Sequence, residues 1–262
     1  MTHDLEGRTA LVTGASAGIG FAAARALALR GARLAIASRG GERLADAQRA
    51  LADEGIAAAA IAADLRHLEE IERLVEEVQM RLGRIDILVA NSGGPTPRPA
   101  VELTEEDWRS AVPAVLLFVP RLVRLALPGM RERRWGRIVA VNSVSSRQPI
   151  PNLALSNALR PAVLGYLKTL SQAVAADGVT VNAVLPGYTL TERQAELVTA
   201  TAARTGRSPE EVRAGWTAAV PAARLAEPEE IGEAVAFLCS PAASYVTGQA
   251  LTVDGGYVRG LL

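Results

Sequence analysis

The residues best suited to bind a ligand form a glycine-rich stretch, Thr13-Gly14-Ala15-Ser16-Ala17-Gly18-Ile19-Gly20. It follows a short apolar run, Thr9–Val12, that predicts a strand, and it opens an Ala/Leu-rich predicted helix, Ile19–Arg30. Glycines let backbone N–H groups approach phosphate oxygens, and the helix dipole favours their negative charge. We therefore expect a pyrophosphate site made by Gly14, Ser16, Gly18, Ile19 and Gly20, although a tight turn with nothing bound needs the same glycines.

Polar residues at the ends of the next two predicted strands indicate which nucleotide would bind. Ser38 and Arg39 stand where an acidic residue would hold the ribose hydroxyls of NAD, and they offer a hydroxyl and a guanidinium to a 2′-phosphate instead. This predicts NADP(H), with NAD less favoured; the alternative for Arg39 is a solvated surface arginine. Asp64 is expected to accept a hydrogen bond from the adenine amine or to cap the following turn.

Strand and helix patterns alternate through the chain, which predicts a parallel sheet covered by helices on both faces. The clearest helix is Leu68–Leu82, whose apolar residues recur at helical spacing. The other predicted strands are Arg33–Ser38, Ile56–Ala63, Ile85–Ala90, Arg137–Val141, Thr180–Leu185 and Ala250–Val253, and the other helices are Glu42–Glu54, Leu153–Ala176 and Glu229–Leu238.

Two regions between these elements are less regular. Thr104–Asp107 predicts a capping box ahead of an apolar helix that reaches about Met130, with a kink or late start because Pro113 and Pro120 fall inside it. Residues 187–220 are predicted to be an irregular insertion that covers the substrate, with one good helix start at Ser208-Pro209. Ligands of open parallel sheets bind at the carboxyl edge, where this insertion is expected.

Composition excludes several classes of function. The 262 residues include 28 basic and 28 acidic ones, so no basic excess favours nucleic acid or an anionic membrane. Cys239 is the only cysteine and His3 and His67 have no ligand-like spacing, which argues against a disulfide and a metal site. We see no secretory signal and no apolar run long enough to span a bilayer, and we expect one cytoplasmic domain over residues 1–262.

Several motifs in order resemble the short-chain dehydrogenase/reductase family over essentially the whole chain. Besides the glycine turn, they are Asp64-Leu65, Ala90-Asn91-Ser92-Gly93, Pro186-Gly187-Tyr188-Thr189-Leu190-Thr191, Thr247-Gly248-Gln249 and Val253-Asp254-Gly255-Gly256. The last two resemble the 3-oxoacyl-(acyl-carrier-protein) reductase branch. The resemblance implies a Rossmann-type doubly wound α/β fold of about seven strands, a small carbonyl or alcohol substrate, and a homotetramer or homodimer. It also implies cofactor contacts from Leu65, Asn91, Gly93, Pro186, Gly187, Thr189 and Thr191.

The resemblance breaks down at the residues that perform the family's chemistry. Members of the family use a serine, a tyrosine thirteen residues later that transfers the proton, a lysine four residues after the tyrosine, and an asparagine in the preceding helix. Ser143 matches the serine, but the same register places Ser156 at the tyrosine, Arg160 at the lysine and Val115 at the asparagine. Arg160 could still bind the ribose, whereas arginine is no proton donor near neutral pH and a serine needs an adjacent base.

Another residue or water would then have to supply the proton. Tyr188, in the loop expected beside the nicotinamide, is a candidate donor or simply a wall of the substrate pocket. Residues around Ile150–Leu155 and Leu190–Val198 favour an apolar substrate, although core packing explains them nearly as well. Two hypotheses follow: an NADP(H)-dependent oxidoreductase with an atypical site (Ser143, Ser156, Arg160, Tyr188), or a nucleotide-binding sensor or assembly protein without redox activity.

Overall fold

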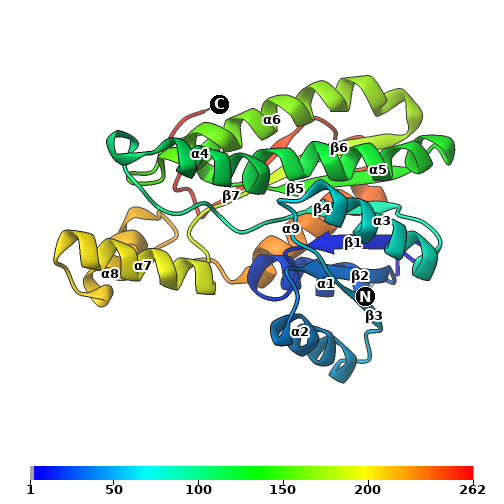
Figure 1. Ribbon diagram of the computed structural model, residues 1–262, viewed down its shortest axis with the longest axis horizontal. Helices are drawn as coiled ribbons and strands as arrows, with labels where there is room; N and C mark the ends of the chain where they lie inside the picture. The colour runs from blue at the N-terminus through cyan, green and yellow to red at the C-terminus, as the bar shows by residue number, and fades with distance from the viewer. Residues whose placement is uncertain (1–2, 262) are drawn as a thin grey trace.

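A single parallel sheet of seven strands organises the molecule, in the order β3-β2-β1-β4-β5-β6-β7 (Figure 1). The computed structural model describes residues 3–261. The order reverses between β1 and β4, so the chain is doubly wound as predicted, and the carboxyl ends of both strands meet at this switch point. The strands are β1 (Thr9–Thr13), β2 (Arg33–Ser38), β3 (Ala58–Ala62), β4 (Ile87–Ala90), β5 (Gly136–Val141), β6 (Val179–Pro186) and β7 (Ala250–Val253).

Helices cover both faces of the sheet, which confirms the predicted layers. One face is packed by α3 (Leu68–Leu82), α5 (Phe118–Glu132) and α6 (Ala154–Val174), above the sheet in Figure 1. The other carries α1 (Gly18–Ala28), α2 (Glu42–Asp53) and α9 (Pro228–Cys239). Every residue of β1, β4, β5 and β6 is buried, as expected for strands covered on both sides.

The predicted kink lies at Pro113. Helix α4 (Glu105–Ala111), opened by the Thr104–Asp107 capping box, passes into a π-helical segment, η2 (Val112–Leu117), before α5 begins. Proline has no N–H for the helical ladder, and π segments absorb such interruptions, often at functional sites. The helix continues through Pro120 to Glu132.

We predicted that no apolar segment is long enough to span a bilayer, and this prediction was wrong. Glu105–Glu132 form one 28-residue helical stretch that is long and apolar enough by length and composition. Part of that apolar surface is buried, because α5 packs Phe118, Leu122 and Met130 against the sheet. A buried core helix meets the same criterion, so the stretch is weak evidence for a membrane span.

The insertion expected to be irregular is instead largely helical. It contains α7 (Glu192–Thr205) and α8 (Pro209–Ala219), which project to one side of the sheet (Figure 1). Ser208 caps α8 as predicted, and Thr191 caps α7 through a hydrogen bond from the Gln194 N–H (3.2 Å). The α7 pattern was missed because only Val198 and Ala202 are buried, too few for a clear apolar stripe.

The amino edge of the sheet is held by a buried carboxylate, Asp86. Its side chain is 0% exposed; Oδ2 accepts from the Thr9 N–H (3.0 Å) and lies 2.9 Å from Arg84 Nε, and Oδ1 is 3.4 Å from Arg133 Nε. Its carbonyl also accepts from the Arg137 N–H (3.0 Å). One residue therefore joins the starts of β1, β4 and β5.

Asp86→Asn should lower the free energy of unfolding by about 1–3 kcal/mol, because an amide removes the negative charge that two arginines face and one acceptor. Urea denaturation monitored by circular dichroism measures the change. Asp53→Asn is the control, since Asp53 is exposed at the end of α2. Equal shifts for the two variants would contradict the structural role of Asp86.

Candidate active and cofactor-binding site

The glycine turn between β1 and α1 is built by close backbone contact. Gly14 and Gly18 have positive φ angles (58° and 55°), and a Cβ on Gly20 would lie 2.1 Å from the Gly14 carbonyl oxygen. A Cβ on Gly14 would lie 2.7 Å from Asn91 Nδ2. Ala17, at the N-cap of α1, has no side chain that could satisfy the first N–H groups of the helix. The turn thus presents free donors and no side chains, which suits a phosphate group.

The other expected pyrophosphate contacts lie on this turn. Ser16 is half-buried, and its hydroxyl has no hydrogen-bond partner within residues 3–261. Ile19 is partly buried against the core cluster on the α1 face. Contact of Ser16 and Ile19 with a pyrophosphate therefore stays a prediction, based on their place in the turn.

Asn91 connects this turn to the end of β4. Its side-chain amide donates to the Gly14 carbonyl (3.1 Å), and its backbone exchanges hydrogen bonds with the Thr13 hydroxyl (2.7 and 3.0 Å). Gly93, two residues on, is exposed with nothing within 4 Å of an added Cβ, which leaves room for a ligand. Asn91 therefore shapes the cofactor site from behind, through the turn.

The polar side chains at the ends of β2 and β3 differ in whether other side chains of the protein already bind them. Arg39 is exposed and forms no ion pair or side-chain hydrogen bond within residues 3–261, whereas the Ser38 hydroxyl accepts weakly from the Gly40 N–H (3.5 Å). Asp64 accepts from Arg66 Nε (3.0 Å) and from its N–H (3.0 Å), and these bonds hold the pKa of the carboxyl below its usual value. Asp64 thus organises the turn after β3, and Leu65 is buried in the core.

The loop after β6 carries the insertion back across the glycine turn. Pro186 ends the strand, and a Cβ on Gly187 would lie 2.7 Å from Asp254 Cβ, so this chain crossing needs a glycine. Thr189 is buried and its hydroxyl bonds the Gly187 carbonyl (3.1 Å). Thr191 lies over Gly18, where an added Cβ would be 3.1 Å from its methyl group. The loop after β6 thus packs directly on the glycine turn at Gly18.

An ion pair joins the insertion to α2. Arg43, in the first turn of α2, pairs with Glu192, the first residue of α7. Both side chains are exposed, so the pair contributes little to stability.

Four polar side chains converge where β5 ends and α6 begins. Ser143 Oγ accepts from the Ser145 N–H (3.1 Å), which leaves its own O–H free to donate. The Ser145 and Ser156 hydroxyls are 2.9 Å apart, and Arg160 Nε donates to Ser156 Oγ (3.1 Å). Ser156 and Arg160 share one face of α6, as their spacing predicts. The structure therefore brings together three of the four predicted catalytic residues and adds Ser145.

Arg160 is a desolvated cation in this cluster. Burial, and then the positive charge of Arg193, lower the pKa of Arg160 to about 10. Within residues 3–261 no carboxylate lies within ion-pair distance of its guanidinium. Its backbone carbonyl accepts from Asn142 Nδ2 (3.0 Å), which anchors this turn of α6 to the end of β5. Pro161 follows inside the helix, where it removes one ladder hydrogen bond.

Val115, at the position of the family's asparagine, lies in η2 and is 2% exposed. It packs with Ala111, Leu155 and Leu159 in a small core cluster between α4 and α6. An amide here would have no polar partner from these neighbours. Leu155, a candidate pocket residue, is therefore a core residue, as the packing alternative allowed.

Tyr188 belongs to an aromatic cluster under the insertion. Its ring stacks on Trp216 of α8 (centroids 5.1 Å, 9°) and meets Tyr257 edge-on (5.0 Å, 69°). Burial, and then a hydrogen bond with Tyr257, raise the pKa of the Tyr188 phenol, so it is a weaker acid than a free tyrosine. This favours the pocket-wall role over the proton donor.

Four residues that contact the predicted site residues, or the loops that carry them, were not predicted from the sequence. They are Ser145, Arg193, Trp216 and Tyr257. Ser145 was the most accessible to prediction, because it lies in the serine-rich run that follows β5.

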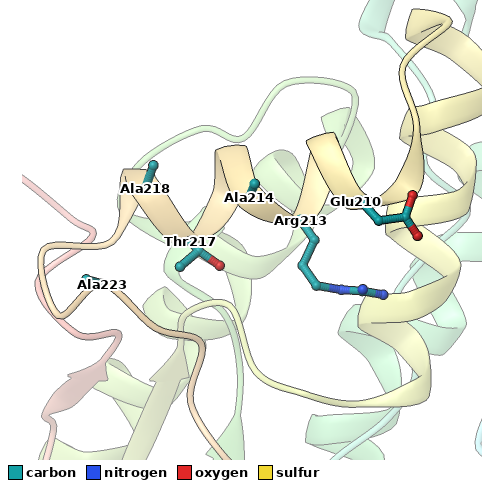
Figure 2. A pocket seen from close by; sticks show the side chains of 6 residues that line it. All are labelled: Glu210, Arg213, Ala214, Thr217, Ala218 and Ala223. Atoms are coloured by element: carbon teal, nitrogen blue, oxygen red, sulfur yellow. The ribbon is translucent and has the colours of Figure 1, made fainter.

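A hollow of about 440 Å³ lies elsewhere, on α8. Figure 2 shows Arg213, Ala214 and Thr217 along one side of this helix and Ala223 in the loop after it. It is open to solvent and none of the predicted site residues lines it. It is therefore separate from the glycine turn and from the Ser143–Ser156–Arg160 cluster.

Comparison with known proteins agrees with this arrangement. A family model described as enoyl-(acyl carrier protein) reductase matches residues 14–258. The 3-oxoacyl-(acyl-carrier-protein) reductase FabG of Vibrio cholerae is 38% identical over 97% of this chain and 98% of its own length. The cis-4-hydroxycyclohexanecarboxylate dehydrogenase of Sinomonas cyclohexanicum is 38% identical over 95% and 96%.

Solved structures also resemble this chain over nearly its whole length. The actinorhodin polyketide ketoreductase, solved with NADPH, superimposes with a TM-score of 0.93 at 38% identity, over 99% of each chain. The L-sorbose reductase of Gluconobacter frateurii, solved with NADPH and L-sorbose, has the same TM-score at 32% identity over 100% of each chain. The fold is thus that of a Rossmann-type oxidoreductase, and this chain belongs to the short-chain dehydrogenase/reductase family.

Gly20→Ala should destabilise the protein by roughly 3 kcal/mol, because its methyl group overlaps the Gly14 carbonyl and neither backbone can move easily. Gly215→Ala is the matched control inside α8, where an added Cβ meets nothing nearer than 3.8 Å, and it should stabilise by about 0.5–1 kcal/mol. Thermal unfolding of both variants tests this. A Gly20→Ala protein as stable as the wild type would mean that the turn is less tightly packed than described.

Proposed function

We propose that the protein is an NADP(H)-dependent oxidoreductase that interconverts a small carbonyl compound and its alcohol. The observation that carries the proposal is that a side-chain-free glycine turn and the Ser143–Ser156–Arg160 cluster lie at the same carboxyl edge of the sheet. The relatives solved with NADPH support the choice of cofactor. When bound, the nicotinamide would supply or accept the hydride.

The residues at the cluster have distinct proposed roles. Ser143 donates its free O–H to the carbonyl oxygen and orients it. Arg160 binds the nicotinamide ribose through its Nη atoms while its Nε holds Ser156. The oxygen of the reduced substrate needs a proton, and in this proposal the Ser156 hydroxyl donates it. Ser156 then regains a proton from Ser145 or from water. Arg160 stabilises the resulting alkoxide by charge and hydrogen bonding.

This assignment makes the site atypical for its family, with Ser156, Arg160 and Val115 in place of the tyrosine, lysine and asparagine. A serine flanked by a cation is a weaker acid than the family's tyrosine–lysine pair. General-acid assistance is typically worth about 10²–10⁴-fold, so we expect slow turnover rather than none. Binding of NADPH with no reduction of any carbonyl compound would favour the alternative, a nucleotide-binding sensor or assembly protein.

The cofactor is tested by fluorescence titration of the protein with NADPH and with NADH. Arg39→Ala should weaken NADPH binding by roughly tenfold or more and leave NADH unchanged, because a guanidinium–phosphate contact is worth about 1.5–3 kcal/mol. Arg49→Ala, on the exposed side of α2, is the control and should change neither. Binding of neither nucleotide by the wild type would refute the proposed function.

The proton donor is tested by NADPH oxidation with ethyl acetoacetate and cyclohexanone as probes. Ser156→Ala should lower kcat roughly 10- to 100-fold with little change in the Kd for NADPH, within the range of general-acid effects. Tyr188→Phe should keep kcat close to that of the wild type, since its phenol is a poor acid here. A large loss of kcat in Tyr188→Phe with none in Ser156→Ala would instead identify Tyr188 as the proton donor.

A further inference from the structure

Two serines of the proposed catalytic cluster close a loop between β5 and α6. The Ser145 and Ser156 hydroxyls are 2.9 Å apart, so residues 146–155, here called the serine loop, leave and return at that contact. A segment whose ends meet in this way is a compact loop of the Ω type. A substrate whose carbonyl oxygen is held by Ser143 or Ser156 must therefore lie beside the serine loop.

Asn157 holds the middle of the serine loop from the first turn of α6. Its Nδ2 donates to the Ile150 carbonyl (2.9 Å), and its Oδ1 accepts from the Ile150 N–H (3.0 Å). The side-chain amide thus pairs with the backbone donor and acceptor of one residue, as a neighbouring strand would. Making both bonds needs a side chain that carries a donor and an acceptor, which an ionised aspartate or an alanine does not offer.

The serine loop is also tied to elements on its other side. Arg147 Nη2 donates to a carbonyl of β7 (3.2 Å), and Gln148 Oε1 accepts from an N–H of the C-terminal tail (3.2 Å). Asn157, by contrast, belongs to α6 and directly follows Ser156 in the chain. Its two bonds therefore set the position of Ile150 relative to the Ser156 hydroxyl.

Ile150 is held by its side chain and by the following turn as well. It is partly buried and packs against the core cluster on the face of α3, α5 and α6. The Leu153 N–H donates to its carbonyl (3.2 Å), and Asn152 between them has a φ of 63°, which asparagine tolerates better than most residues. Backbone and side chain of Ile150 are thus both fixed, which makes it a defined apolar wall beside the serines.

We propose that Asn157 is a positioning residue that sets substrate selectivity: by holding Ile150, it fixes the space between the serine loop and the serine hydroxyls and so limits the size of the ketone. This inference rests on the proposed function and deepens it, because it concerns what selects the substrate at the same site. Asn157 acts through Ile150 and not on the reacting atoms. Without its two bonds the loop moves outward and admits larger ketones.

The test compares cyclohexanone with 4-tert-butylcyclohexanone, which present the same ring ketone without and with added bulk. NADPH oxidation gives kcat and KM for each, and calorimetry with NADP+ bound gives each Kd. Asn157→Ala should shift the ratio of kcat/KM values, and the ratio of Kd values, roughly tenfold toward the larger ketone, within the range that pocket fit controls. The Kd for NADPH should stay unchanged, because both bonds of the Asn157 side chain go to the serine loop.

Hydrogen exchange followed by mass spectrometry tests the clamp itself. Asn157→Ala should speed exchange in residues 147–153, while α3 and α5 keep their protection. Gln79→Ala removes an exposed amide from α3 and is the control, which should leave exchange in the serine loop and the ketone ratios as they are.

Two conservative variants separate the hydrogen bonds from the volume of the side chain. Asn157→Asp has nearly the same shape but cannot donate to the Ile150 carbonyl when ionised, so it should resemble Asn157→Ala. Asn157→Gln keeps the donor and the acceptor and should restore part of both the protection and the ketone ratio. General damage to the fold would not follow this order and would weaken NADPH binding too.

Two results would overturn the inference. One is an Asn157→Ala protein with unchanged exchange in residues 147–153, which would mean that the clamp does not hold the loop. The other is faster exchange with unchanged ketone ratios, which would mean that the loop does not select the substrate. Failure of the proposed function is distinct from both: NADPH would not bind, or neither ketone would be reduced, while exchange and the ratio of ketone Kd values would still report on the clamp.

Discussion

The contact between Gly20 and the Gly14 carbonyl is the constraint on which the rest of the site depends. Only a missing Cβ lets α1 begin so close to the end of β1. The first N–H groups of the helix have no side-chain cap, so they remain available to a phosphate group. Asn91 holds the same carbonyl from β4, so the two strands at the switch point share one hydrogen-bonded unit. The loop after β6 then closes over this unit at Gly18.

The three departures from the family pattern are consistent with one another in physical terms. Ser156 is short enough to let Arg160 bend back and donate from Nε to its hydroxyl, an arrangement that a tyrosine would displace. Val115 joins Leu155 and Leu159 in an apolar contact, so its neighbours offer no polar group to a proton relay. Each of the three side chains therefore has partners in the structure that suit its own chemistry.

Charge is distributed unevenly among the proposed cofactor and catalytic residues, although the whole chain is neutral. Asp64 is occupied by Arg66 and Glu192 by Arg43, whereas Arg39 and Arg160 have no acidic partner within residues 3–261. The carboxylates near the ligand positions are therefore neutralised while two cations remain available. A net charge of zero hides this local excess, which only the pairing of individual side chains reveals.

The amino-acid sequence by itself determined the parallel sheet, its order of elements and the glycine turn. These features depend on local patterns: largely apolar runs predicted β2 and β7 to the residue, and apolar spacing predicted α3 to the residue. The spacing of Ser156 and Arg160 likewise placed both on one face of α6.

Only the tertiary structure decided which side chains meet across long stretches of chain. It paired Arg193 with Pro95, stacked Tyr188 on Trp216, and placed Val115 against Leu155. It also revealed α7, whose two buried apolar residues, Val198 and Ala202, pack on Val212 of α8. Such contacts have no signal in the sequence, since they depend on how distant elements approach one another, and that approach is set by the packing of the whole core.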